Sequence, residues 1–175
     1  MAKIQVFYDY QCPFCKKGYE NLIELLPDYK AVEIEWRPIE SHPRPENYSP
    51  HTDLCIQGFY IAQELGADIS AFHALMFEAV CKEKRNVEEP EVLADIIQGI
   101  IDREKFLNLL KSQKFASRVN ENNDLAYEKE GIWYVPSFRV ISPEGRRDLK
   151  LDAKGGVGVS IEEMKNFLDI ITKIL

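Results

Sequence analysis

The chain has 175 residues, of which 45% are hydrophobic and 29% charged, with a net charge of −7 and a pI near 5.1. These values are ordinary for a globular protein with one well-buried core, or for one domain that carries an insertion. The acidic excess argues against nucleic acid as a partner, because no basic stripe is present to neutralise phosphates. No apolar run is long enough to span a membrane, and no signal-peptide pattern precedes the first expected strand. We therefore expect a cytoplasmic protein.

Two cysteines stand where the first expected strand gives way to the first expected helix. The apolar run over residues 4–8 predicts the strand, and residues 16–26 predict the helix. Cys12 and Cys15 lie between them, and a CxxC pair at such a junction favours redox chemistry. Half of a zinc site and a structural disulfide are the alternatives. The zinc interpretation needs a second ligand pair at short spacing, and structural disulfides are rare in the cytosol.

The junction also predicts which cysteine reacts. If Cys12 is the N-cap, Pro13 occupies the first helical position, where its missing N–H costs nothing. The Cys12 sulfur then lies among unpaired backbone N–H groups at the positive end of the helix dipole, which favours the thiolate. We therefore expect the pKa of Cys12 to fall below about 8.5. Cys15, one turn later, is expected to face inward, so Cys12 would be the attacking sulfur and Cys15 the resolving one.

A second strand and a long helical segment follow. Alternating apolar and charged residues over 31–37 predict the strand, which completes a strand–helix–strand unit. Residues 38–50 contain four prolines and are expected to form an ordered loop. From about 52 to 130 nearly the whole chain is expected to be helical, with the last helix running from about 112 through 126. Helix starts and ends are predicted at Pro90, Asp102, Gly66 and Gly131.

Beta structure returns near the C-terminus. Residues 135–141 and 147–151 flank a Ser-Pro-Glu-Gly tetrad and predict a hairpin, and Ser160 with Glu163 predicts a capping box for a closing helix. Without the helical block, the order is βαβ followed by ββα. The expected fold class is therefore α/β, a thioredoxin fold interrupted by an all-helical insertion domain. The thioredoxin-fold domain would comprise residues 1–50 and 129–175, and the insertion residues 51–128.

Three segments resemble the DsbA-like thiol–disulfide oxidoreductases, and among them the FrnE-type branch. The segments are 7–15, with an aspartate three residues before the first cysteine; 90–96 followed by 101–106; and 131–138, which is similar to the family's cis-proline segment. The resemblance implies a cis Val135–Pro136 bond beside the cysteines. It also implies that substrate is bound by the neighbours of the reactive sulfur, namely Pro13, Phe14, Val135 and Pro136.

The sequence departs from the family at two positions. Val6 stands where related proteins carry a buried acid, so Asp9 becomes the candidate for proton transfer, with a surface or turn carboxylate as its alternative. Phe14 offers no charge where DsbA has a histidine, so we expect a less oxidising couple than in DsbA. Trp133, Tyr134 and Tyr10 either line an apolar groove or belong to the core.

The expected function is disulfide exchange with protein or small-molecule thiol and disulfide substrates, through a mixed disulfide at Cys12. A glutathione-dependent isomerase or transferase and a non-catalytic peptide-binding module are the alternatives. Neither a cofactor nor a metal is expected, and the sequence does not indicate an oligomeric state. Cys55 and Cys81 are expected to be buried on helix faces, with a second redox pair as the alternative.

Overall fold

The computed structural model describes residues 2–142, 145–149 and 159–174, which form two compact units. The thioredoxin unit comprises Met1–Tyr8, Cys12–Arg37 and Ile132–Leu175, and the helical unit comprises Asp9–Gln11 and Pro38–Gly131. Residues 38–50 and the three residues before Cys12 thus group with the helices by their contacts. The domain bounds expected from the sequence, 1–50 with 129–175 around 51–128, stay a prediction.

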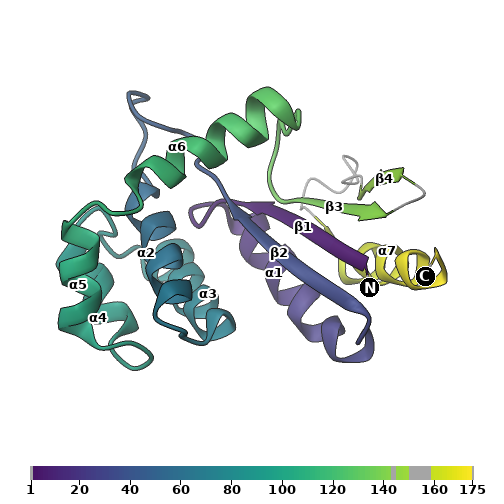
Figure 1. Ribbon diagram of the computed structural model, residues 1–175, viewed down its shortest axis with the longest axis horizontal. Coiled ribbons are helices and arrows are strands. Elements are labelled where there is room, and N and C mark those ends of the chain that lie inside the picture. The colour runs from purple at the N-terminus through teal and green to yellow at the C-terminus, as the bar shows by residue number, and fades with distance from the viewer. Residues whose placement is uncertain (1, 143–144, 150–158, 175) are drawn as a thin grey trace. The chain divides into compact units, whose positions relative to one another are not determined.

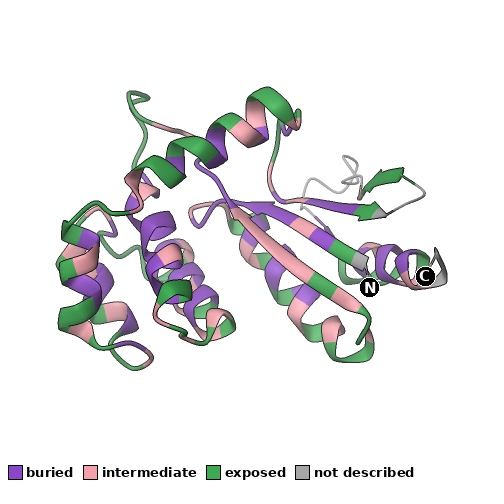
Figure 2. Ribbon diagram, viewed as in Figure 1, coloured by how far each residue is buried: buried purple, intermediate pink, exposed green. Residues whose placement is uncertain are grey.

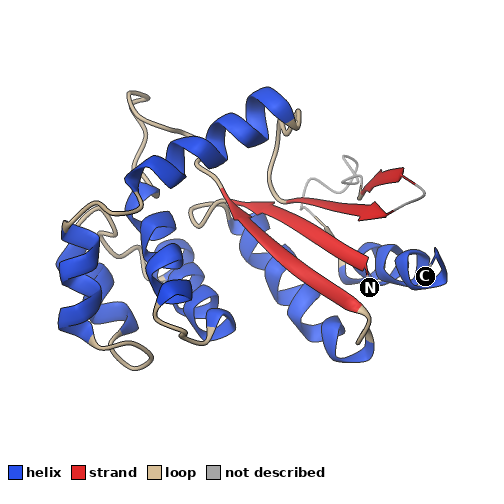
Figure 3. Cartoon of the chain, viewed as in Figure 1, coloured by secondary structure: helices blue, strands red, loops and turns tan. Residues whose placement is uncertain are grey.

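The thioredoxin unit is a four-stranded sheet with two long helices (Figures 1 and 3). Its elements are β1 (Ala2–Tyr8), α1 (Pro13–Leu25), the 3-10 turn η1 (Leu26–Asp28), β2 (Val32–Pro38), β3 (Ser137–Ser142), β4 (Gly145–Asp148) and α7 (Ile161–Ile174). The strand order is β2-β1-β3-β4, and β3 runs antiparallel to both β1 and β4. This βαβ…ββα order is the predicted thioredoxin fold.

The core of this unit follows from the strand register. Ile4 pairs with Val140 and Val6 with Phe138, and all four side chains are buried (Figure 2). Alternate residues of a strand face one side of the sheet, so this register lines up one apolar face. The apolar stripe of α7, with Leu168 fully buried, adds to the core.

The hairpin and the closing cap are confirmed within the described residues. β3 pairs with β4 from Ser142↔Gly145 to Arg139↔Asp148, whereas Pro143 and Glu144 of the predicted turn lie outside the described residues, as do 150–151 and the connector 154–158. Ser160 N–H donates to Glu163 Oε2 at 2.7 Å, and Glu163 N–H donates to Ser160 Oγ at 3.2 Å. These reciprocal bonds form the predicted capping box.

The helical unit accounts for the long block predicted between the strands. Its elements are α2 (Asp53–Glu64), α3 (Ile69–Phe77), the π-helical turn η2 (Glu78–Lys82), α4 (Pro90–Ile97), α5 (Arg103–Lys111), α6 (Ala116–Asp124) and the π-helical turn η3 (Leu125–Lys129). Gly66 and Gly131 follow helices with φ of +67° and +63°, as predicted for helix-ending glycines. Asp102 caps α5 by accepting a hydrogen bond from Lys105 N–H at 2.8 Å.

The core of this unit contains a buried histidine among aromatic rings. His73 is 0% exposed, its ring is stacked on Phe59 with centroids 5.4 Å apart, and its Nδ1 shares a 2.9 Å hydrogen bond with Tyr10 Oη. Burial lowers the pKa of His73 to about 3, because the charged form would lose its hydration. His73 is therefore a neutral core residue at neutral pH.

The last helix of the block begins later than predicted. The sequence placed its start at about 112, but α5 ends at Lys111 and α6 begins only at Ala116. Gln113 between them has a φ of +55°, and Ser112 Oγ donates to Leu109 O at 2.6 Å. Local side-chain bonds of this kind compete with helix continuation, and apolar periodicity does not reveal them.

Across the described residues, the helices are all too short or too polar to cross a bilayer.

Candidate active site

Cys12 lies at the start of α1, as the sequence predicted. It is the N-cap residue, with φ −84° and ψ 114°, and Pro13 occupies the first helical position. Cys15 N–H donates to Cys12 Sγ at 3.3 Å, and the first turn of the helix contains no acidic side chain. A sulfur that accepts a helix N-terminal N–H, with no carboxylate in that turn, is stabilised as the thiolate.

Cys15 occupies the next turn of the same helix and is shielded. It is 1% exposed, whereas Cys12 is partly exposed, and all four cysteines of the chain are thiols in this structure. Of the two sulfurs, only that of Cys12 is presented to solvent. That Cys12 makes the first contact with an incoming disulfide stays a prediction, which this difference in exposure supports.

The peptide bond that precedes Pro136 is cis and lies beside the reactive sulfur. The Val135–Pro136 bond is cis, as the resemblance implied, and Cys12 Sγ donates to Val135 O at 3.7 Å. A thiol hydrogen bond of this length is weak, so it leaves the sulfur available. Cys12 and the main chain of Val135 therefore share one surface of the thioredoxin unit.

Gly18 allows α1 to approach this segment closely, a role that the sequence analysis did not find. A Cβ at position 18 would lie 3.1 Å from Phe138 Cζ and 3.3 Å from Pro136 Cγ. These distances are shorter than ordinary van der Waals contact, so a side chain there would displace its neighbours. The only sequence signal was a glycine inside an expected helix. Glycine there is less favourable than alanine by about 0.5–1 kcal/mol, so its presence indicates a packing requirement.

Exposed aromatic residues flank the two active-site segments in sequence. Phe14 is 40% exposed, Trp133 82% and Tyr134 51%. Trp133 and Tyr134 come directly before Val135, and Phe14 follows Pro13 in α1. Tyr10 differs from them, since it is fully buried in the helical unit. The two interpretations offered by the sequence thus divide: Tyr10 belongs to the core, and Trp133 and Tyr134 belong to the surface.

Asp9 is fully buried and holds together what we call the Asp9 cluster, formed with Gln11, Ser41 and Thr52. Its Oδ1 accepts hydrogen bonds from Thr52 Oγ1 at 2.7 Å and Gln11 N–H at 3.2 Å. Its Oδ2 accepts from Ser41 N–H at 2.7 Å and Gln11 Nε2 at 3.1 Å. Asp9 is therefore not a surface carboxylate, but its bond to the N–H of Gln11, two residues on, is that of the turn carboxylate offered as the alternative. The cluster holds the chain of the helical unit in place as far as Gln11, the residue directly before Cys12.

The other two cysteines lie in the helical unit. Cys55 is 0% exposed, and burial raises the pKa of its thiol well above the ordinary range. Cys81 is partly exposed and donates its thiol hydrogen to Tyr10 O at 3.1 Å. Cys55 has the environment of an inert core cysteine, whereas Cys81 is accessible. In the part of the chain that the structure describes, no three His, Cys, Asp or Glu side chains are grouped so as to hold a metal ion.

A CxxC pair at the start of the first helix of a thioredoxin fold is typical of a thiol–disulfide oxidoreductase. Residues 3–68 match the family model described as the DSBA-like thioredoxin domain. The DsbA-like assignment made from the sequence is thus confirmed, and the FrnE-type branch stays a prediction.

Individual relatives agree with this class. The chain is 26% identical over 173 residues to the uncharacterized protein YwbO of Bacillus subtilis (strain 168), covering 78% of this chain and 86% of that protein. Among solved structures, the cytosolic disulfide reductase DsbM from Pseudomonas aeruginosa has a TM-score of 0.76 at 13% identity, covering 99% of this chain and 100% of that one. The same protein with GSH has a TM-score of 0.73 at 12% identity, covering 98% and 99%. A putative protein disulfide isomerase from Nitrosomonas europaea has a TM-score of 0.75 at 16% identity, with 98% of each chain covered. At these identities the structural matches establish a shared fold.

Proposed function

We propose that the protein exchanges disulfides with thiol and disulfide substrates through Cys12, by way of a mixed disulfide. The observation that carries this proposal is the position of Cys12 Sγ, which lies 3.3 Å from Cys15 N and 3.7 Å from Val135 O. The first contact favours the thiolate, and the second puts the sulfur next to main chain that an extended substrate can pair with. The exposed Phe14 offers an apolar contact for such a substrate.

The reaction balances as two exchanges. The Cys12 thiolate attacks one sulfur of a substrate disulfide, forms a mixed disulfide and releases the other substrate sulfur as a thiolate. Cys15 then loses its proton and attacks Cys12 Sγ, which closes the Cys12–Cys15 disulfide and releases the second substrate sulfur. The substrate gains two electrons and the cysteine pair loses two. The reverse sequence oxidises a dithiol substrate.

The roles of the neighbouring residues are part of the proposal. Pro13 and Phe14 on one side, and Val135 and Pro136 on the other, would contact the substrate chain around the mixed disulfide. Asp9 as a proton-transfer group for Cys15 stays a prediction, and its four hydrogen bonds also give it a structural role. A cytoplasmic location is included in the proposal, because a protein of the same fold is described as a cytosolic disulfide reductase.

Small thiols of the glutathione type are the second substrate class that we propose. A protein of the same fold has been solved with GSH. In this chain, Gln11 lines a cavity of about 350 Å³ in the helical unit, together with Lys84 and Arg85. The positive charges of Lys84 and Arg85 favour a ligand that carries carboxylates. Gln11 is the residue directly before Cys12 in the chain.

Trapping the mixed disulfide tests the proposal. A Cys15→Ser variant cannot resolve the intermediate, so glutathione disulfide should leave one glutathione half on Cys12, as detected by intact mass and peptide mapping. Cys81→Ser should be included in every protein, since Cys81 is partly exposed and would react on its own. The matched control, Cys12→Ser, should gain no adduct. If Cys15→Ser gains none while Cys12→Ser/Cys15→Ser still binds extended peptides, a non-catalytic peptide-binding module replaces the enzyme.

A further inference from the structure

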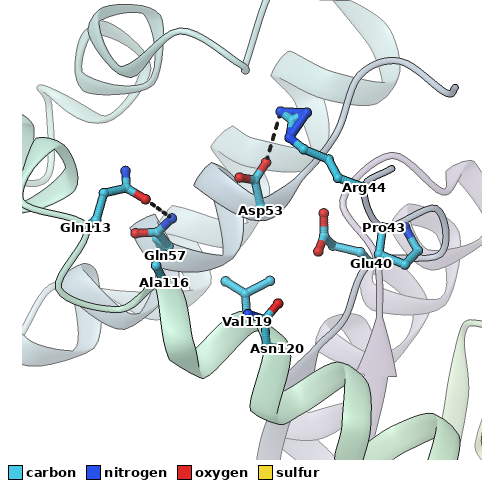
Figure 4. A pocket seen from close by; sticks show the side chains of 9 residues that line it. All are labelled: Glu40, Pro43, Arg44, Asp53, Gln57, Gln113, Ala116, Val119 and Asn120. Atoms are coloured by element: carbon cyan, nitrogen blue, oxygen red, sulfur yellow. Dashed lines mark hydrogen bonds and ion pairs between the residues drawn. The ribbon is translucent and has the colours of Figure 1, made fainter. Parts of the chain in front are cut away.

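A polar cavity in the helical unit is separate from the residues assigned to disulfide exchange. Its volume is about 190 Å³, and its walls come from the loop after β2, from α2 and from α6 (Figure 4). The side chains of Glu40, Asp53 and Gln57 surround the hollow, and Arg44 reaches Asp53 (Figure 4). Every lining residue belongs to the helical unit.

Two buried acceptor oxygens around this cavity, Glu40 Oε1 and Gln57 Oε1, lack a hydrogen-bond donor. A third oxygen, Asp53 Oδ1, has no hydrogen bond and is met only by the ion pair with Arg44 at 3.6 Å. Glu40 is 4% exposed and Gln57 2%, so water outside the protein does not reach these groups freely. Buried acceptors without donors are uncommon, because each loses the hydrogen bonds that water would give it in the unfolded chain.

The other polar atoms of the Glu40 and Gln57 side chains are already used, which fixes the orientation of their orphan oxygens. Glu40 Oε2 accepts a hydrogen bond from Asn123 Nδ2 at 3.1 Å. Gln57 Nε2 donates to Gln113 Oε1 at 3.1 Å, so the oxygen is the part of the Gln57 amide left over. The polar atoms that Glu40 and Gln57 leave unused at the cavity are therefore both acceptors.

The lining also carries a net negative charge, which favours a cation as ligand. Glu40 and Asp53 contribute two negative charges against one positive charge from Arg44. Arg44 Nη2 is 3.6 Å from Asp53 Oδ1 and 2.9 Å from Glu88 Oε2, so its charge is shared with a carboxylate outside the lining. Burial raises the pKa of Glu40, with Asp53 and Asp9 adding to the shift and Asn123 opposing it. A cation in the cavity would relieve that unfavourable burial.

We propose that this cavity binds a primary ammonium group on a short alkyl chain. An ammonium group carries one positive charge and three N–H donors with no acceptor, which suits the two orphan oxygens, the Asp53 oxygen shared with Arg44, and an acidic lining. Pro43, Ala116 and Val119 supply an apolar wall for the alkyl carbons. The volume exceeds that of a single water, which occupies about 30 Å³ in the liquid. The site rests on the helical unit alone and does not require the redox function.

The site shares its supporting chain with the Asp9 cluster. Glu40 is followed by Ser41, and Asp53 is preceded by Thr52. Ser41 N–H and Thr52 Oγ1 are the two donors that approach Asp9 to 2.7 Å. A ligand that orders Glu40 and Asp53 is therefore expected to slow amide hydrogen exchange at the neighbouring Ser41 and Thr52.

The test is a titration of the full-length, ¹⁵N-labelled protein with n-butylammonium chloride, followed by NMR. We expect saturable shifts in the side-chain amide signals of Gln57 and Gln113, and at least tenfold weaker binding in Glu40→Gln. Asp53→Asn serves as a second variant should Glu40→Gln fold poorly. Glu46→Gln is the matched control, because it removes an equal charge from an exposed site in the same loop and should leave the affinity unchanged.

Other probes separate the competing occupants. Butanol and tetramethylammonium should shift these signals at least tenfold less, since one lacks charge and the other lacks N–H donors. Nα-acetyl-lysine methylamide, which keeps its side-chain ammonium, would identify a protein lysine as the source of the group if it binds as well as butylammonium. Weaker binding of this probe would identify a free amine. Equal shifts with potassium chloride, or undiminished butylammonium binding in Glu40→Gln, would overturn the proposal. No shift with any probe would mean a cavity filled by water alone.

Discussion

Replacing Asp9 by alanine should destabilise the helical unit substantially. The substitution removes both acceptor oxygens of the Asp9 cluster and leaves the Thr52 hydroxyl and the Ser41 N–H without their 2.7 Å partner. Thr52 is 1% exposed, so external water cannot replace the carboxylate easily. A hydrogen bond to a charged group contributes about 1.5–3 kcal/mol. The two short bonds therefore predict a loss of about 3–6 kcal/mol in the free energy of unfolding.

The assay combines urea unfolding with amide hydrogen exchange read by mass spectrometry. Exchange shows where protection is lost, which matters because two units need not unfold together. In Asp9→Ala, protection should fall in peptides covering residues 9–11 and 38–55, and be retained in those of β3. Thr52→Val is the matched control, because it removes one donor and should cost about 1–2 kcal/mol. In the double variant the two losses should be strongly non-additive.

Two outcomes would refute this account of Asp9. A loss below about 1 kcal/mol in Asp9→Ala would mean that the cluster contributes little. Retained stability in Asp9→Asn, together with a changed pH–rate profile for the attack by Cys15, would instead make Asp9 a proton-transfer group.

Three further predictions concern pH, packing and redox potential. Burial lowers the pKa of His73 to about 3 in the folded protein, whereas the pKa in the unfolded chain is about 6.5. The unfolded chain therefore binds a proton first as the pH falls. The free energy of unfolding of the helical unit should decrease by up to about 1.4 kcal/mol per pH unit from about pH 6.5 towards pH 3. Urea titrations should show that His73→Phe flattens this slope; an unchanged slope would contradict it. Gly18→Val, whose Cβ would meet Phe138 Cζ at 3.1 Å, should destabilise by about 1–3 kcal/mol and slow disulfide exchange, while Lys17→Val on the exposed face should do neither. The reduction potential, measured in glutathione buffers, should be more negative than the DsbA value of about −120 mV, and Phe14→His should raise it.

Local chemistry made the start of α1 predictable from the sequence. A proline directly after Cys12 predicts the first helical position, because the ring fixes φ and needs no donor. The capping box at Ser160 follows from the same kind of short-range pairing. Features set by neighbours in sequence can be found without a structure.

Features that depend on distant partners could not be found in this way. Asp9 is held by Ser41 and Thr52, which are 32 and 43 residues away, and no pattern connects them in the chain. His73 lies on an apolar helix face, but its neutral state depends on burial by distant residues such as Phe59, which stacks on its ring, and Tyr10, which hydrogen-bonds to it. The orphan oxygens of Glu40 and Gln57 likewise exist only because tertiary packing buries them.

The pKa of Cys12 is the most direct test of the central claim, that the start of α1 makes this sulfur the nucleophile. The pH dependence of iodoacetamide alkylation, measured on a Cys15→Ser/Cys81→Ser protein and assigned by peptide mass, reports that value. The helix terminus and the Cys15 N–H contact predict a pKa clearly below about 8.5, with alkylation confined to Cys12. A pKa at or above that value, or faster alkylation of the buried Cys55, would contradict the account.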